Sequence, residues 1–320
     1  MYKKNYFNWE VIQLNTYLGI DIGGTSIKYG VYDKYGNEVK KGKNKIKTPK
    51  YDMSKFIKSI KLIMDECGPV DGVGLSVPGC VNPNSGYIQD GGSIRILDKI
   101  NIKYILEKEL DKTVEVENDA NCALLAEKWV GNATECKNFV CITLGTGIGG
   151  ALYINNGLVS GNNYFSGEFG YMILDNIHEK YRLKTLNKTS STVSFVREIA
   201  NKKGVNSKSL DGVSVFDMIQ NKDNEVLELY KMWIRRVAIC IYNVGFIVDP
   251  EKILIGGGIS NQPIFIDDLK SEMKRLSIEL IKETGKIENL YKKWNIGPCK
   301  FFNDSGQIGA IYNYIVRNEF

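Results

Sequence analysis

The sequence predicts an α/β protein made of two domains with a cleft between them. Short apolar strands alternate with amphipathic helices along the chain. A strand, a glycine-rich turn and a second strand occur in residues 17–32 and again in residues 139–154, which indicates a weak internal duplication. The length of 320 residues also fits two domains of roughly 100–200 residues each.

The first predicted domain covers residues 1–130. It opens with apolar strands at Tyr17–Ile22 and Ser26–Tyr32, joined by a glycine turn, and a further strand begins near Glu38. Met53–Glu66 has apolar residues at helical spacing and predicts a helix. The remaining elements expected in this domain are a buried strand at Gly72–Val77, a helix at Ile102–Leu110, a strand at Thr113–Val116 and a helix at Ala120–Val130.

The second predicted domain covers residues 131–305 and repeats the opening pattern. The expected elements are strands at Phe139–Thr143, Ala151–Ile154 and Gly157–Ser160, a helix at Val226–Gly245, a strand at Lys252–Ile255 and a helix at Ile266–Glu279. A last helix is predicted at Gln307–Val316. It lies in the segment 306–320, which we expect to pack back on the first domain.

The composition excludes several classes of protein. The net charge of +5 is small and spread along the chain, so we expect no nucleic-acid partner. No apolar run approaches the ~18 residues of a membrane span, and the first fifteen residues lack the apolar core of a signal peptide. The seven cysteines form no CxxC pair and predict reduced thiols in a cytoplasmic protein. A single histidine, His178, excludes sites that need two.

The first glycine-rich hairpin is a candidate phosphate site. Backbone N–H groups of Gly23 and Gly24, the Thr25 hydroxyl and the Lys28 ammonium are placed to bind phosphate oxygens. Asp21, just before the turn, is a candidate to hold Mg²⁺ through water. Taken alone, the segment has the alternative of an ordinary glycine hairpin.

The second hairpin, Thr143–Gly150, joins two apolar strands in the same way, with Thr146 and Gly147 at its tip. Two such hairpins facing each other across a cleft would bind ATP from both domains. A third glycine cluster contains Gly256 and Gly257 and follows a strand, where it leaves room for a flat ring to lie on the backbone. The alternative for this cluster is a simple turn between strand and helix.

The segment Glu117–Asn121 lies where a strand ends and a helix begins, the usual place for catalytic side chains in α/β sheets. Asp119 is the candidate to accept a hydroxyl proton, and Asn118 the candidate to orient the sugar. The helix N-terminus is expected to keep Asp119 ionised at neutral pH. The alternative is that Asn118 or Asp119 only caps the helix.

Together these motifs resemble the ROK family of sugar kinases and repressors, within the actin-like, hexokinase-type ATPase superfamily. The resemblance runs from about Tyr17 to the C-terminus and is carried by Asp21–Thr25, Val77–Gly79, Glu117–Asn121, Gly145–Gly150, Gly167–Tyr171 and Gly256–Gly258. It implies two actin-like (ribonuclease H-like) domains with ATP and Mg²⁺ bound between them. It also implies a hexose held by residues that match Gly79, Asn118, Asp119 and Glu168, with Asp119 at the position of the catalytic base.

The chain departs from the family pattern at its zinc site. The family motif Gly-Glu-x-Gly-His, whose His contacts the sugar and binds zinc, ends here in Tyr171, and the family cysteine cluster is replaced by residues 181–191 without any cysteine. We therefore expect no zinc. The second sugar-binding Glu of the family is also missing, and its place falls near Asn187.

The predicted function is transfer of the γ-phosphate of ATP to the 6-hydroxyl of a hexose, with a small-molecule sugar as partner. Glucose or a β-glucoside is the expected acceptor, and N-acetylmannosamine is the alternative, because zinc-free family members with Tyr resemble proteins assigned to these sugars. A repressor is disfavoured because only about sixteen residues precede Tyr17, too few for a DNA-reading domain. A silent sugar sensor is disfavoured by Asp119. A homodimer is one assembly that the sequence leaves open.

Tyr171 is the candidate specificity residue. One ring of the pair Phe169 and Tyr171 is expected to face the core and the other the cleft: Phe169, the apolar member, is expected in the core, and the Tyr171 phenol, which needs a polar partner, in the cleft. In the alternative, both rings are buried and Tyr171 is structural.

Overall fold

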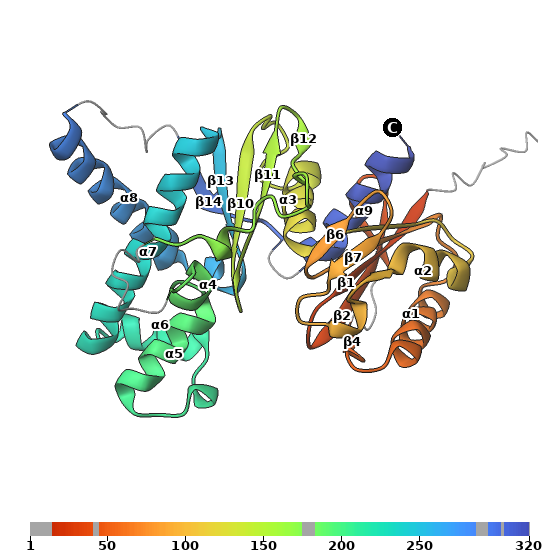
Figure 1. Ribbon diagram of the computed structural model, residues 1–320, viewed down its shortest axis with the longest axis horizontal. Helices are drawn as coiled ribbons and strands as arrows, with labels where there is room; N and C mark the ends of the chain where they lie inside the picture. The colour runs from red at the N-terminus through yellow and green to blue at the C-terminus, as the bar shows by residue number, and fades with distance from the viewer. Residues whose placement is uncertain (1–14, 41–44, 175–182, 286–293, 302–303, 320) are drawn as a thin grey trace, which may run out of the picture.

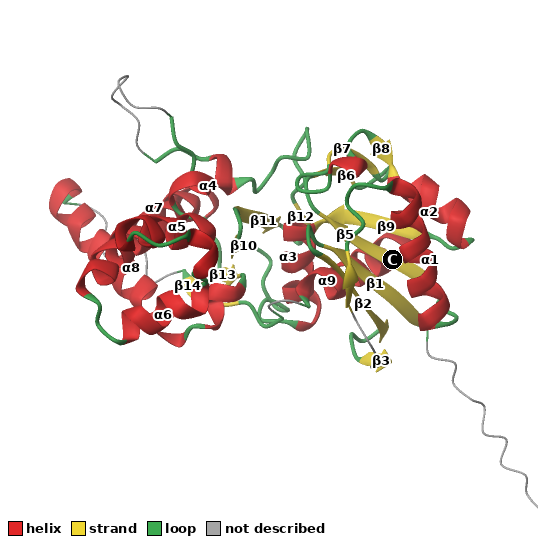
Figure 2. Cartoon of the chain, turned by 90° about the horizontal axis from the view of Figure 1, so that it is seen from below, coloured by secondary structure: helices red, strands yellow, loops and turns green. Residues whose placement is uncertain are grey.

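The computed structural model describes residues 15–40, 45–174, 183–285, 294–301 and 304–319. Two main sheets dominate this part of the chain, and two helices, α3 (Asp119–Val130) and α9 (Ser305–Asn318), lie between them (Figures 1 and 2). No described helix is long and apolar enough to cross a lipid bilayer. His178 and residues 1–14 lie outside the described residues. So do residues 41–44, near the edge strand that the alternating lysines Lys43, Lys45, Lys47 and Lys50 predict.

The N-terminal half contains the sheet with strand order β3-β2-β1-β5-β9, in which β4 also pairs with β2. The strands β1 and β2 are antiparallel, whereas β1, β5 and β9 run parallel. A small second sheet has the order β6-β7-β8. The elements are β1 (Thr16–Ile22), β2 (Ser26–Asp33), β3 (Glu38–Lys40), β4 (Lys45–Lys47), α1 (Met53–Cys67), β5 (Gly72–Val77), β6 (Cys80–Asn82), β7 (Tyr87–Asp90), η1 (Arg95–Leu97), β8 (Ile100–Asn101), α2 (Ile102–Leu110), β9 (Val114–Asn118) and α3.

The C-terminal half contains the sheet with strand order β12-β11-β10-β13-β14. Its outer face packs against the helices α5, α7 and α8 in one apolar core, on the side away from α3 (Figure 1). The elements are β10 (Phe139–Leu144), β11 (Ile148–Ile154), β12 (Gly157–Leu158), η2 (Phe169–Tyr171), α4 (Leu186–Thr189), α5 (Thr192–Lys203), η3 (Ser207–Ser209), α6 (Gly212–Gln220), α7 (Asn224–Val248), β13 (Lys252–Gly256), η4 (Gly258–Asn261), α8 (Pro263–Thr284) and β14 (Asn295–Pro298).

The N-terminal sheet has one bulky face and one small face. On β1, the side chains of Leu18, Ile20 and Ile22 join the core that also includes α1 and α2. Because side chains alternate along a strand, Gly19 and Asp21 lie on the opposite face, toward α9. A Cβ at Gly19 would overlap the carbonyl oxygen of a residue in α9. The small face therefore lets α9 lie directly on the backbone of the sheet.

The helices α3 and α9 also pack closely against each other, as α9 does against the N-terminal sheet. A Cβ atom at Gly309 in α9 would overlap the carbonyl oxygen of Cys122 in α3. Along its length α9 contacts β1, β5 and β9, while α3 also contacts β10 and β11 of the other sheet. The helix pair thus joins the two halves.

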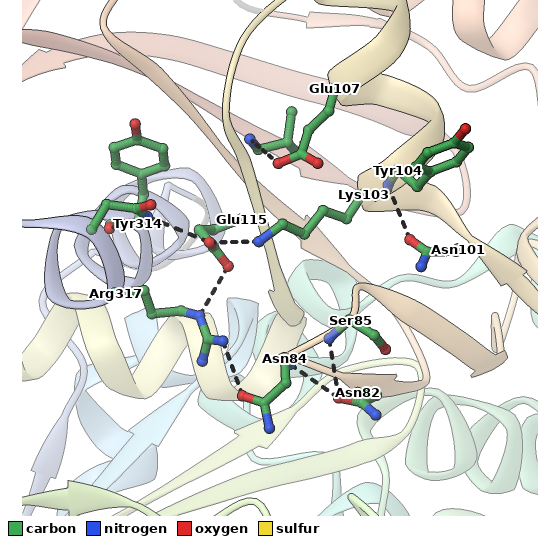
Figure 3. A network of polar contacts seen from close by, with 12 residues as sticks. Asn82, Asn84, Ser85, Asn101, Lys103, Tyr104, Glu107, Glu115, Tyr314 and Arg317 are labelled. Atoms are coloured by element: carbon green, nitrogen blue, oxygen red, sulfur yellow. Dashed lines mark hydrogen bonds and ion pairs between the residues drawn. The ribbon is translucent and has the colours of Figure 1, made fainter.

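A buried carboxylate secures the C-terminal end of α9. Glu115 on β9 is almost fully buried and accepts hydrogen bonds from Lys103 Nζ of α2 at 2.7 Å and Arg317 Nε of α9 at 2.9 Å (Figure 3). Arg317 also donates to Asn84 Oδ1 in the turn between β6 and β7, at 3.0 Å. This network connects four elements at one edge of the N-terminal half.

The predicted strands and helices named above are present, with ends shifted by a few residues. The strand predicted at Ala151–Ile154 begins earlier, at Ile148, because the turn of the hairpin is shorter than expected. The elements not predicted are the small sheet β6-β7-β8, the helices α4, α5 and α6, and the edge strand β14. Most of these are short, with weak periodicity in the sequence.

We expect Gly309→Ala to lower the melting temperature by several degrees. A methyl group at the contact between α3 and α9 must displace backbone, and overpacking of this kind costs about 1–3 kcal/mol, or roughly 2–4 °C for each kcal/mol in a protein of this size. The control is Gly297→Ala, since a Cβ there meets no atom within 4 Å. Equal melting temperatures for the two variants would show that α3 and α9 do not pack as described.

Candidate active site

A cleft of about 770 Å³ opens between the two halves. The N-terminal half contributes the ends of β1 and β5 and the first turn of α3, and the C-terminal half contributes the hairpin between β10 and β11, η2 and the end of β13. The predicted site residues that line the cleft are Asp21, Gly23, Gly24, Thr25, Lys28, Gly79, Asp119, Thr146, Gly147, Glu168, Tyr171, Gly256 and Gly257. Two sheets far apart in sequence therefore deliver these residues to one place.

Asn118 is the predicted site residue that does not line the cleft. Its Oδ1 caps α3 by accepting hydrogen bonds from the backbone N–H groups of Ala120 at 2.9 Å and Asn121 at 3.1 Å. Its Nδ2 donates to the carbonyl oxygen of Gly79 at 2.9 Å. The capping alternative is thus what the geometry shows, and a contact between Asn118 and a sugar stays a prediction.

Asp119 is the first residue of α3 and lies exposed in the cleft, where its Oδ1 accepts a hydrogen bond from the Ala120 N–H at 2.9 Å. Protein atoms still crowd its carboxylate, and this burial, followed by the negative charges of Asp21 and Glu168, raises its pKa to about 7. The prediction that the helix N-terminus keeps Asp119 ionised at neutral pH is therefore wrong. Near pH 7 the protonated and ionised forms have similar populations.

Asp21 lies at the end of β1 under the N-terminus of α9. Burial raises its pKa, while the Ser76 hydroxyl, which donates to Asp21 Oδ1 at 2.9 Å, and the Lys28 ammonium, 4.0 Å from Oδ2, act in the opposite direction. A Cβ at Gly306 would lie 2.5 Å from the Asp21 carboxylate, so α9 begins in contact with this side chain. Lys28 therefore both lines the cleft and balances part of the Asp21 charge.

The donor set around Asp21 fits a water-mediated magnesium complex. Among the described residues, no group of three or more His, Cys, Asp and Glu side chains is arranged to hold a metal ion. Magnesium in proteins is commonly bound through one or two carboxylates, with waters and substrate phosphates completing the shell. A single carboxylate beside the glycine-rich turn at Gly23 and Gly24 matches that pattern.

Contacts on both sides fix the position of the hairpin between β10 and β11. Its turn is closed by a hydrogen bond from the Gly145 N–H to the Gly147 carbonyl oxygen at 2.9 Å. On the β11 side, Asn187 Oδ1 accepts from the Ile148 N–H at 2.7 Å. Asn187 thus fixes the hairpin to α4, in the position where the resemblance suggested a sugar contact.

On the β13 side, Gly257 contacts the start of the same hairpin. Its φ angle is +90°, in the region that favours glycine, and a Cβ there would overlap the carbonyl oxygen of Leu144. The glycines at positions 256 and 257 therefore let the end of β13 pack closely against the hairpin. A flat ring lying on this backbone stays a prediction.

Phe169 and Tyr171 belong to η2, a 3₁₀ turn. Phe169 is 8% exposed and packs in the core of the C-terminal half, whereas Tyr171 is 65% exposed and lines the cleft. The prediction of one buried and one cleft-facing ring is confirmed. The alternative in which both rings are buried is not.

Several residues that line the cleft were not predicted from the sequence. They come from several separate segments, and they include Lys50, Asp90, Ser93, Phe165, Cys299 and Ser305. The Asp90-Gly-Gly-Ser93 turn carried a usable signal, since it is another glycine pair, and a Cβ at Gly24 would lie 2.8 Å from Ser93 Oγ. Phe165 had no such signal.

The chain matches the ROK family over residues 17–315. The chain belongs to the ROK family. Its relatives include a β-glucoside kinase from Listeria innocua, 35% identical over 300 residues that cover 92% of this chain and 96% of the relative. A β-glucoside kinase from Klebsiella pneumoniae is 32% identical over 92% of this chain and 94% of the relative.

Solved structures confirm the expected two-domain, actin-like fold. A Listeria monocytogenes protein described as a candidate N-acetylmannosamine kinase superposes with a TM-score of 0.83 at 33% identity, covering 94% of this chain and 99% of that chain. A ROK family protein from Streptococcus pneumoniae in complex with sucrose superposes with a TM-score of 0.84 at 28% identity, covering 95% of this chain and 99% of that chain.

We expect Gly145→Ala to weaken ATP binding without destabilising the fold. A Cβ at Gly145 meets no atom within 4 Å, and the residue has no positive φ, so the methyl group affects only a ligand that approaches the hairpin. The KM for ATP should rise by roughly tenfold or more, since a methyl group that holds the phosphates away from the hairpin weakens their hydrogen bonds to its backbone, and each hydrogen bond to a charged group is worth about 1.5–3 kcal/mol.

The matched control is Gly297→Ala, outside the cleft lining, where a Cβ likewise meets no atom within 4 Å; its KM for ATP and its melting temperature should both stay near the wild-type values. An unchanged KM for ATP in Gly145→Ala would mean that the hairpin does not contact the nucleotide.

Proposed function

We propose that the protein is an ATP-dependent sugar kinase that transfers the γ-phosphate to the 6-hydroxyl of a β-glucoside or of glucose. The observation that carries the proposal is the position of Asp119, a carboxylate at the N-terminus of α3 that faces a cleft lined by both glycine-rich hairpins. The similarity to β-glucoside kinases over more than nine-tenths of the chain supports the same acceptor class.

ATP lies between the two halves in this proposal. Its phosphates meet backbone N–H groups at the tips of the two turns, those of Gly24 and Thr25 and those of Thr146 and Gly147, because the Gly23 and Gly145 N–H groups donate to the carbonyl oxygens of Ser26 and Gly147. The Thr146 hydroxyl is a further donor, and the adenine lies on Gly256 and Gly257. Phosphoryl transfer depends chiefly on positioning and charge neutralisation. Mg²⁺ held near Asp21 through water would neutralise charge on the phosphates.

Asp119 accepts the proton from the 6-hydroxyl as the oxygen attacks the γ-phosphate in line. Its pKa of about 7 suits this role, because a base is most effective when its pKa lies near the working pH. The sugar is held by Gly79, Asn118, Glu168 and Tyr171. Of these, Glu168 lies close enough for its charge to raise the pKa of Asp119. The proposed base and this proposed sugar contact therefore lie in the same region of the cleft.

N-acetylmannosamine is the second candidate acceptor. It is supported by the similarity to the Listeria monocytogenes protein described as a candidate kinase for that sugar. A non-catalytic sugar sensor of the same family is the alternative from another class, and the cleft-facing carboxylate of Asp119 argues against it.

The domain boundaries and the cellular location of the protein follow from the same proposal. We place the domain boundaries near residues 131 and 305, with the last helix belonging to the first domain, because α9 packs on β1, β5 and β9. A cytoplasmic location fits an enzyme that uses ATP and whose seven cysteines are all free thiols.

We expect Asp119→Asn to abolish sugar-dependent ATP turnover while ATP still binds. The change keeps the shape of the side chain and removes the proton acceptor, an effect of ~10²–10⁴ or more for a positioned base. The measurement is a coupled ATPase assay over a panel of glucose, β-glucosides and N-acetylmannosamine, with Asp65→Asn on the exposed face of α1 as the control.

More than a tenth of wild-type activity in Asp119→Asn would remove Asp119 from the mechanism. Absence of turnover by the wild-type protein with every sugar in the panel would contradict the kinase function itself.

We expect the purified protein to contain no structural zinc, because the sequence lacks the family cysteine cluster and carries Tyr171 in place of the family His. Elemental analysis should find far less than one zinc per chain. A value close to one per chain would refute the expectation.

A further inference from the structure

Two aromatic side chains stand exposed in the wall of the cleft. Phe165 is 49% exposed and Tyr171 is 65% exposed, and both line the same cleft as Asp119 and Glu168. Exposed aromatic surface inside a concave site commonly marks a place where a ligand binds. Neither ring has a packing role that requires this position, in contrast to the buried Phe169 between them.

Backbone hydrogen bonds hold both rings beside Glu168. The Glu168 N–H donates to the Phe165 carbonyl oxygen at 3.3 Å, and the Tyr171 N–H donates to the Glu168 carbonyl oxygen at 3.1 Å. The two aromatic residues therefore flank Glu168 at intervals of three residues in one hydrogen-bonded segment, and all three residues line the cleft.

The loop that carries Phe165 has a defined shape. Gly161, Tyr164 and Gly167 all have positive φ angles, and the Ser166 N–H donates to the Ser160 carbonyl oxygen at 3.4 Å. The thiol of Cys80, the residue after Gly79, lies 3.4 Å from the carbonyl oxygen of Asn163 in this loop. The loop of the C-terminal half thus reaches the N-terminal half at the predicted sugar contact.

Phe165 and Tyr171 lie on the β11 side of the hairpin between β10 and β11, and the proposed adenine site lies on the other side of this hairpin. In the sheet order β12-β11-β10-β13-β14, the turn η2 packs on β11, whereas Gly256 and Gly257 follow β13 on the far side of β10. Nucleotide binding along Gly256 and Gly257 therefore leaves Phe165 and Tyr171 uncovered. Their occupant is a part of the acceptor and not of ATP.

We propose that Phe165 and Tyr171 form a subsite for the aglycone of a β-glucoside, the group attached through oxygen to C1 of the phosphorylated glucose. This rests on the proposed function and names the substrate more closely. The apolar C–H face of a second sugar ring, or the face of a phenyl group, packs well on an aromatic ring. An equatorial β-linkage keeps that second ring roughly in line with the first, so it can extend along the cleft wall.

The test compares kcat/KM for cellobiose and for phenyl β-glucoside with kcat/KM for glucose, in the wild type and in Phe165→Ala. The ratio of glucoside to glucose should fall by about three- to tenfold in Phe165→Ala, the range expected for loss of one aromatic contact. Phe165→Tyr keeps a ring at this position and should retain most of the ratio. Tyr104→Ala removes an equally exposed ring on α2, outside the cleft, and should leave the ratio unchanged.

Tyr171→Phe separates stacking from hydrogen bonding, because it keeps the ring and removes only the hydroxyl. In this variant the ratio of kcat/KM for the glucosides to kcat/KM for glucose should fall less than in Phe165→Ala, with little change in melting temperature.

An unchanged ratio in Phe165→Ala, or a wild type that phosphorylates glucose but no glucoside, would overturn the subsite while leaving a sugar kinase in place. Absence of turnover by the wild type with glucose and both glucosides would instead overturn the proposed function.

Discussion

The close packing of α3 on α9 is the contact on which the rest of the structure depends. Gly309 lets the two helix backbones touch at Cys122, and the small face of β1 and β5 lets α9 lie on the N-terminal sheet. The N-terminal ends of the two helices then meet at the cleft. Asp119 begins α3, and Gly306 at the start of α9 contacts Asp21. Two carboxylates almost a hundred residues apart are thereby brought within electrostatic reach.

This arrangement has a chemical consequence. Glu168, just before η2 in the other half, adds a third carboxylate to the same region, and burial, followed by the negative charges of Asp21 and Glu168, raises the pKa of Asp119 to about 7. Charge repulsion of this kind is typical of sites that handle protons. In the proposed function the two glycine hairpins supply the complementary element, because backbone N–H groups bind phosphate without adding another side chain. The proposed site thus combines a base with a phosphate-binding backbone.

Much of this could be predicted from the sequence, for reasons visible in particular residues. The alternation of large and small residues in β1 and the glycine pairs at Gly23 and Gly256 depend only on neighbouring residues. Such patterns can be recognised from the sequence without the structure. The raised pKa of Asp119 could not be predicted, because it depends on burial and on Asp21 and Glu168, whose distances to Asp119 are set by the tertiary fold. The exposure of Phe165 likewise depends on a loop held in place by contacts across the cleft.

The most direct test of the account is the pH dependence of the difference in melting temperature between Asp119→Asn and the wild type. The pKa of Asp119 is higher in the folded protein than in the unfolded chain, so the folded state binds its proton more tightly and the wild type loses stability as pH rises from about 4 to about 7. Asn does not titrate. The account predicts that the variant gains stability relative to the wild type across this window, with a constant difference above it. A difference that stays the same from pH 4 to pH 8, or changes in the opposite direction, would contradict it.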